Sequence, residues 1–252
     1  MVFDVCADKL QQAQVAFDSR AFQKAAQEFS EALKVCPQRE AILVSLGQTQ
    51  FLAGDENAAE QTLLQASTPA ARYALGRIYY EQARYVEAAS QLEQVTAREP
   101  GNYRAHDNLA LCYDALQRDS DALKHFFRAL DLVKDAHREY DWAYANLAEF
   151  FLKRDQFEKA FPLAAEAAER NPSGARNFFL AGQALVKLGQ FQNSLKWLKR
   201  AVELDPAYAE AHYQLGQALR HLGQAEEAKT HLGIFRELKT RGPATPGRRT
   251  IR

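Results

Sequence analysis

The residues that could carry chemistry are few in this chain of 252 residues, and their spacing does not build a catalytic site. His106 and Cys112 are a base and a nucleophile, but a separation of six residues puts them nearly opposite each other on a helix. Asp107 and Asp114 lie two turns apart on one helix face, where we expect a solvated acidic stripe, because a general acid–base pair needs a desolvated pocket. We therefore expect that the protein is not an enzyme.

Metal and nucleotide motifs are also missing from the sequence. There is no HExxH, no GxxxxGK[ST] and no GxGxxG, and the six histidines are scattered as expected for surface or half-buried imidazoles. The three cysteines, Cys6, Cys36 and Cys112, form no CxxC pair and no metal-ligand spacing. We expect no cofactor, no metal, and three reduced, buried thiols in a cytosolic protein.

Composition narrows the choice of partner. Lys and Arg total 32, as do Asp and Glu, so the formal net charge is zero, which is not expected of a nucleic-acid binder that works through bulk charge. The chain is 47% hydrophobic and 25% charged, as folded proteins are. It has no run of 18 apolar residues and begins without the features of a signal peptide, so we expect a cytoplasmic protein with no membrane span.

The elements that position these residues repeat along the chain. "GQALVKLGQ" starts at Gly182 and "GQALRHLGQ" starts 34 residues later, at Gly216. Small residues recur at one place in seven successive units: Ala13, Gly47, Gly76, Ala110, Ala148, Gly182 and Gly216. Prolines end four of the units: Pro37, Pro100, Pro172 and Pro206. Small residues let two antiparallel helices approach closely where they cross, and a proline stops a helix.

This pattern resembles the tetratricopeptide repeat, which has a 34-residue period and a Leu-Gly, Tyr, Ala, Phe and Pro signature. "HYQLGQAL", "AEEAKTHL" and "RYALGRIYYEQARYVEAASQLEQVTAREP" carry the resemblance. It implies an all-α fold, a right-handed α-solenoid superhelix of about seven helix-turn-helix repeats in a single domain over residues 1–240. The units are 6–39, 40–68, 69–102, 103–140, 141–174, 175–208 and 209–240, and residues 241–252 are expected to be a disordered basic tail.

Two units depart from the period. The second has 29 residues, and we expect Thr68 to cap a helix that starts at Pro69. The fourth has 38 residues, and its four extra residues are about one helical turn, so we expect a longer second helix.

The resemblance implies that the first helix of each repeat lines a concave inner face, where family members hold extended peptides or partner helices. We therefore expect a non-enzymatic protein-protein interaction scaffold whose protein or peptide partner the sequence does not identify. Aromatic and Arg side chains are enriched at binding hot spots. The candidate groove residues are Tyr73, Arg77, Tyr80, Arg104, Asn108, Trp142, Asn146, Arg176, Phe179, Tyr213 and Arg220, with Phe17 and Gln48 on the same face.

Several alternatives stay open. Phe179 and Tyr213 could instead pack between neighbouring repeats. Asn108 and Asn146 occupy equivalent places and could bind a peptide backbone, although two of seven units do not make a full asparagine ladder. The chain could also be an assembly subunit that oligomerises through its ends, or an RNA or anionic-ligand binder that uses Arg77, Arg104, Arg176 and Arg220.

The C-terminal end raises the question of self-association. The last predicted helix, Ala225–Leu238, places Ile234, Phe235 and Leu238 on one half of its surface. Either Phe235 turns inward and caps the array, or the three side chains are exposed and form a homodimer through this end.

Overall fold

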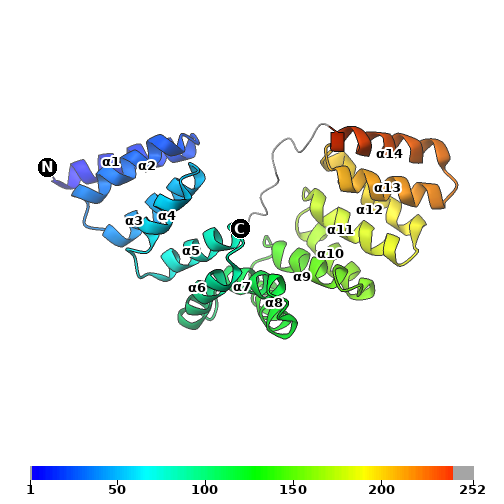
Figure 1. Cartoon of the computed structure of the whole chain (residues 1–252), viewed down its shortest axis with the longest axis horizontal. Coiled ribbons are helices and arrows are strands. Elements are labelled where there is room, and N and C mark those ends of the chain that lie inside the picture. The colour runs from blue at the N-terminus through cyan, green and yellow to red at the C-terminus, as the bar shows by residue number, and fades with distance from the viewer. Residues whose placement is uncertain (1, 241–252) are drawn as a thin grey trace. The chain divides into compact units, whose positions relative to one another are not determined.

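The computed structural model describes residues 2–240, with side chains from Val5 onward, and within that range it is all-α, as predicted. Two helices lie in each predicted repeat, side by side (Figure 1), for example α1 with α2 and α13 with α14. The helices are α1 (Val2–Asp18), α2 (Phe22–Val35), α3 (Arg39–Leu52), α4 (Glu56–Leu63), α5 (Pro69–Glu81), α6 (Tyr85–Arg98), α7 (Tyr103–Ala115), α8 (Asp119–Val133), α9 (Trp142–Leu152), α10 (Phe157–Arg170), α11 (Ala175–Lys187), α12 (Phe191–Leu204), α13 (Ala209–His221) and α14 (Ala225–Thr240).

The helices group into two compact units. The first ends at Ala122 and the second begins at Leu123, both within α8. A single solenoid over residues 1–240 stays a prediction, and the predicted tail, residues 241–252, lies outside the described residues. None of the helices between residues 2 and 240 combines the length and the hydropathy that a membrane crossing needs.

The small residues sit where the two helices of a pair meet, as predicted. A Cβ atom added to Gly182 would lie 2.5 Å from Leu198 Cγ, and one added to Gly216 would lie 2.7 Å from Leu232 Cγ. The alanines at the same place, Ala13, Ala110 and Ala148, are completely buried. The leucine of the second helix therefore fills the space that the missing side chain leaves in the first.

The turn between the two helices of each repeat has one backbone geometry in all seven repeats. One residue there has a positive φ, and the second helix begins two residues after it. These residues are Arg20, Gly54, Ala83, Gln117, Asp155, Gly189 and Gly223. Four of the seven are not glycine, although a left-handed conformation costs such residues about 1–2 kcal/mol each. The packing of the helix pair therefore decides the shape of this turn.

The expected helix starts and stops of the early repeats are confirmed. Thr68 Oγ1 accepts a hydrogen bond from the Ala71 backbone N–H at 3.2 Å, and α5 begins at Pro69. Pro37, Pro100, Pro172 and Pro206 each lie two residues beyond the last residue of a second helix.

The expectation of a longer second helix in the fourth repeat is wrong. Helix α8 has 15 residues, against 14 in α6, so the extra residues lie in the connection 134–141. Arg170 of α10 donates hydrogen bonds to the carbonyl oxygens of Val133 (3.3 Å) and Lys134 (3.0 Å). Asp141, at the other end of the connection, accepts hydrogen bonds from Asn171 and Asn177. These contacts satisfy the end of α8 and hold the connection in place, so the helix does not continue.

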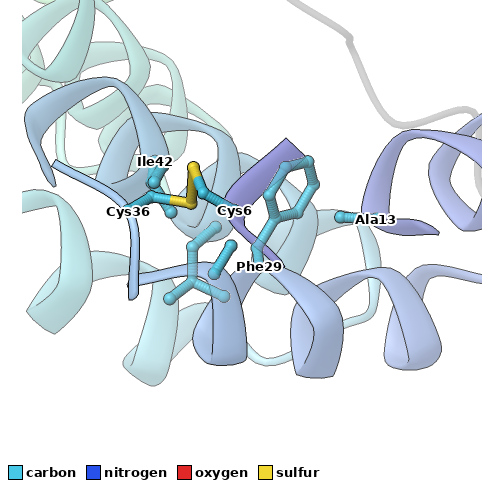
Figure 2. Close-up of a cluster of buried hydrophobic side chains, with 7 residues drawn as sticks. Cys6, Ala13, Phe29, Cys36 and Ile42 are labelled. Carbon is cyan, nitrogen blue, oxygen red and sulfur yellow. A yellow bond between two sulfur atoms is a disulfide. The ribbon is translucent and has the colours of Figure 1, made fainter. Parts of the chain in front are cut away.

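The expectation of three reduced thiols is also wrong, because Cys6 and Cys36 form a disulfide. Figure 2 shows the bond between α1 and the turn after α2, beside Phe29 and Ile42 of a buried cluster. Cys36 directly follows the end of α2, so the antiparallel pairing of α1 and α2 brings it back to the start of α1. Cys112 is a free, buried thiol, and burial raises its pKa to about 12.

Candidate functional site

The residues that suggested chemistry have structural roles. His106 Nε2 lies 3.2 Å from the Pro100 carbonyl oxygen, and His212 Nε2 lies 3.1 Å from the Pro206 carbonyl oxygen. A carbonyl can only accept, so in both residues Nε2 carries the proton and donates it. Each histidine thus ties the turn before its helix to that helix. Asp107 is only 1% exposed, so the expected solvated acidic stripe is wrong for this residue.

A second histidine contact joins the last two helices. Since His212 Nε2 donates to Pro206, its Nδ1 is free to accept, and His231 Nδ1 donates to it across 3.0 Å. Burial is the main cause that lowers the pKa of His231, followed by the charge that His212 can carry and, more weakly, by Lys199, while Glu227 raises it.

This pair predicts a pH effect on the C-terminal helices. The pKa of His231 in the folded state lies below its ordinary value of 6.5, so the unfolded state binds the proton more readily. The stability of α13 and α14 should therefore be complete above pH 6.5 and should fall as the pH drops toward the folded-state pKa. Urea unfolding at several pH values, compared between the wild type and His231→Gln, checks this. Equal pH dependence in both proteins would contradict it.

In the first unit, the first helices of repeats one to three enclose a cavity of about 160 Å³. Its lining consists of Phe17 from α1, Gln48, Phe51 and Leu52 from α3, and Ala74, Arg77 and Ile78 from α5. We call this cavity the inner cavity. Its walls are mostly apolar, with one amide and one guanidinium group among them. A small apolar hollow with a few polar groups is the usual form of a site that anchors one side chain of a ligand.

Arg77 is the charged group of the inner cavity. Its Nε is buried and has no hydrogen-bond partner, and no carboxylate within residues 2–240 forms an ion pair with the guanidinium. Arg84 of this unit pairs with Glu60 at 2.8 Å. Arg72 donates through Nη1 to Gln91 at 3.2 Å, although its Nε, like that of Arg77, is buried without a partner. An arginine that the chain leaves without an acceptor is suited to bind a carboxylate of a partner.

The other candidates of the first unit lie around α5. Burial raises the pKa of the Tyr73 hydroxyl, against the opposing effect of Arg77 and Arg104. Asn108 on α7 is buried, and its amide donates to the Tyr73 hydroxyl at 2.9 Å. The Tyr80 ring packs edge-on against Tyr85, with centroids 5.3 Å apart. These contacts hold Tyr73 and Tyr80 in place on the helix that also carries Arg77.

In the second unit, three candidates form one cluster around Arg176 of α11: Arg176 itself, and Trp142 and Asn146 of α9. The Arg176 Nη2 atom donates to Glu149 Oε2 at 2.6 Å and to Asn146 Oδ1 at 3.0 Å. The guanidinium also lies 5.2 Å from the Trp142 ring centroid, a cation–π contact. Arg176 is therefore already paired with a carboxylate of its own chain, unlike Arg77.

The remaining candidates contact neighbouring parts of the last two repeats. Phe179 is buried and contacts Tyr208, the residue before α13, with ring centroids 4.8 Å apart. Tyr213 is 39% exposed and contacts Phe235 on α14 at 5.0 Å, and Arg220 donates to Gln217 on its own helix. Phe235 is half-buried, as are Ile234 and Leu238. Dimerisation through this end stays a prediction.

An array of antiparallel helix pairs, with a small cavity on its first helices, belongs to the class of helical-repeat scaffolds. Residues 10–74 and 73–137 match the family model of the tetratricopeptide repeat, and residues 182–228 match a TPR repeat model. The first of these alone matches more than half of the chain, so the chain belongs to the tetratricopeptide repeat family. Repeats of this family are in general non-enzymatic scaffolds that bind other proteins.

Solved structures show the same fold at low sequence identity. A tetratricopeptide repeat protein from Parabacteroides merdae superposes with a TM-score of 0.71 at 14% identity, covering 96% of this chain and 95% of that one. MamA from Desulfovibrio magneticus gives 0.60 at 19%, covering 70% and 97%. The Cut9–Hcn1 hetero-tetramer of the APC/C gives 0.73 at 16%, covering 85% and 42%. The search of curated proteins finds no match.

Proposed function

We propose that this protein is a non-enzymatic scaffold that binds a partner protein segment on the first helices of its repeats, anchored at the inner cavity. The observation that carries the proposal is Arg77, a cation with no acceptor among residues 2–240, in the wall of an apolar cavity. Leaving its Nε buried and unpaired costs free energy, and a bound partner that supplies an acceptor recovers it.

The lining suggests the chemistry of the bound segment. The inner cavity has about 160 Å³, and its apolar walls suit a single aliphatic side chain. A carboxylate next to that side chain would face Arg77, and the Gln48 amide would face the backbone of the segment. Tyr73 and Tyr80, on the same helix as Arg77, would contribute aromatic contact area.

Two alternatives receive less support. A binder of RNA or other polyanions needs several free cations, but Arg176 is paired with Glu149 and Arg220 is hydrogen-bonded to Gln217. Binding of the partner by Trp142, Asn146 and Phe179 stays a prediction, and their contacts within the second unit give them a structural role as well.

The test compares two arginines of α5. Partners are captured from the native lysate with the wild type, with Arg77→Ala and with Arg72→Ala, and are identified by mass spectrometry. We expect a set of partners that Arg77→Ala loses by about tenfold or more, as for the loss of a charged hydrogen bond, and that Arg72→Ala retains. Circular dichroism should show equal helix content in all three proteins. If both variants captured every partner to the same extent as the wild type, the partners would not bind at the inner cavity.

A further inference from the structure

A second and larger cavity lies in the second unit, mainly on the second helices of its repeats. It has about 390 Å³ and is lined by Phe161, Leu185, Gln190, Gln192, Asn193, Lys196 and Trp197. Phe161 belongs to α10 and Leu185 to the end of α11, Gln190 directly precedes α12, and the last four belong to α12. We call it the outer pocket, because second helices build most of it and none of the candidate groove residues lines it.

Aromatic rings form the apolar part of the outer pocket. The Trp197 indole meets Phe161 edge-on, with centroids 5.8 Å apart and planes at 86°. Phe178 of α11 also contacts the indole, with centroids 5.9 Å apart and planes at 40°. All three rings are half-buried, and the Trp197 Nε1 has no hydrogen-bond acceptor in the described chain. Contacts with two aromatic side chains restrict the motion of Trp197, which lowers the entropic cost of binding against it.

The rim of the outer pocket is made of side-chain amides. Gln190, Gln192 and Asn193 follow one another around the start of α12, and Gln192 and Asn193 are exposed. The Asn193 amide donates to Gln190 Oε1 at 3.1 Å, whereas the side chain of Gln192 forms no hydrogen bond with the rest of residues 2–240. Amides both donate and accept, so such a rim can pair with the backbone of a peptide of any sequence.

The charge of the outer pocket is positive. Lys196 has no carboxylate at ion-pair distance within residues 2–240, while Lys199 and Arg200 on the same helix pair with Glu227 (3.6 Å) and Glu203 (3.2 Å). The Lys196 Nζ lies 5.0 Å from the Trp197 ring centroid. No acidic side chain lines the pocket. A carboxylate that binds beside Trp197 would therefore be attracted by Lys196, and no acidic side chain of the lining would repel it.

We propose that the outer pocket is a second protein-binding site, which takes a segment with an aromatic side chain next to carboxylates. The aromatic side chain would fill the cavity against Trp197, the carboxylate would pair with Lys196, and the amide rim would hold the backbone. One cation and three amides do not suit nucleic acid, which is bound through several phosphates at once. The site is independent of the inner cavity, which lies in the other compact unit.

The chain offers its own reporter for this site. It has two tryptophans, so Trp142→Phe leaves Trp197 as the single emitting indole. The probe is a blocked hexapeptide with one phenylalanine between aspartate and glutamate residues. When this probe is added stepwise, the emission maximum of Trp197 should shift and then reach a constant value. The affinity should fall about tenfold in Lys196→Glu, as expected when an attractive charge becomes repulsive, and should weaken as salt is raised.

Matched controls distinguish binding at the outer pocket from nonspecific electrostatic attraction between the acidic probe and the protein. Lys199→Glu changes the same charge three residues further along α12, where the lysine already has a partner, and should alter the affinity much less. A probe with asparagine and glutamine in place of the acids should bind about as weakly as the acidic probe binds Lys196→Glu. In Trp197→Phe, the remaining indole, Trp142, should not respond to the probe.

Several results would overturn the proposal. These are an unchanged Trp197 emission at about millimolar probe, equal binding of the neutral probe, or equal losses in Lys196→Glu and Lys199→Glu. A response of Trp142 alone would place the acidic segment on the first helices instead. Lys196 is exposed, so we expect its variants to fold, and Lys196→Gln with unchanged circular dichroism repeats the test without reversing the charge.

Discussion

Reducing the Cys6–Cys36 disulfide is expected to lower the stability of the first repeats by about 3–4 kcal/mol. The bond joins residues 30 positions apart, and a crosslink of that span restricts the unfolded chain by about this amount. In a linear repeat array the loss should stay local, because each repeat contacts only its neighbours. Hydrogen exchange, measured with and without a thiol reductant, should show faster exchange in α1 and α2 and unchanged exchange in α11 to α14.

The effect should extend to the inner cavity through Phe17. This residue lines the cavity from α1, the helix that the disulfide attaches to the end of α2. The double variant Cys6→Ala, Cys36→Ala is the control, and its exchange should not respond to the reductant, since the remaining thiol, Cys112, is buried. Unchanged exchange of α1 in the reduced wild type, or equal loosening of α13 and α14, would refute the prediction.

Replacing Gly182 with alanine should destabilise the protein, and the same replacement at Gly233 should stabilise it. The added methyl group at Gly182 would lie 2.5 Å from Leu198 Cγ and 3.3 Å from the Leu198 backbone nitrogen, so a buried leucine must move. Overpacking of this kind costs about 1–3 kcal/mol. At Gly233, in the middle of α14, no atom outside the adjoining residues and the backbone of the same helix lies within 4 Å of the added methyl group. Alanine favours a helix by about 1 kcal/mol over glycine.

Urea unfolding of the two variants beside the wild type measures the difference between them. Both substitutions are identical and both lie inside a helix, so intrinsic helix propensity contributes equally and only the surroundings differ. If both substitutions changed the free energy of unfolding in the same direction, the close contact between Gly182 and Leu198 would be contradicted. Hydrogen exchange should further locate the effect of Gly182→Ala in α11 and α12.

The sequence predicted the repeating parts of the fold because each repeat solves the same packing problem. Gly182 and Gly216 leave space for a leucine of the second helix, and this need appears in the sequence as a 34-residue period. Thr68 and Pro69 mark a helix start through local hydrogen bonding and a fixed backbone angle. Such signals depend on residues close together in the chain or at one constant distance.

The features that the sequence did not predict depend on contacts unique to one place. Arg170 donates back to the carbonyl oxygen at the end of α8, and Asp141 accepts hydrogen bonds from Asn171 and Asn177. Arg98 makes a similar bond to the Ser67 carbonyl oxygen, but an arginine at this place is not part of the repeat signature. The disulfide needs two particular positions of the first repeat. Of the inner cavity, Phe17, Gln48 and Arg77 were expected on the inner face, whereas Phe51, Leu52 and Ile78 were not, because apolar residues at helical spacing look like core.

The shared left-handed turn also determines where such a chain can change its length. In every repeat the crossing residue, for example Gly47 or Ala148, precedes the turn residue by seven positions, and the second helix follows it by two. Both departures from the 34-residue period, the short second unit and the long fourth unit, fall after the second helix has begun. The fourth unit holds its extra residues in the junction 134–141, whereas the second unit has a shorter second helix, α4, with 8 residues against 14 in α6. Changes of length thus fall in the second helix or in the junction that follows it. The connection 134–141 is accordingly a natural position for adding a loop or a tag, whereas a single inserted residue near Ala83 would turn a whole helix face away from its partner.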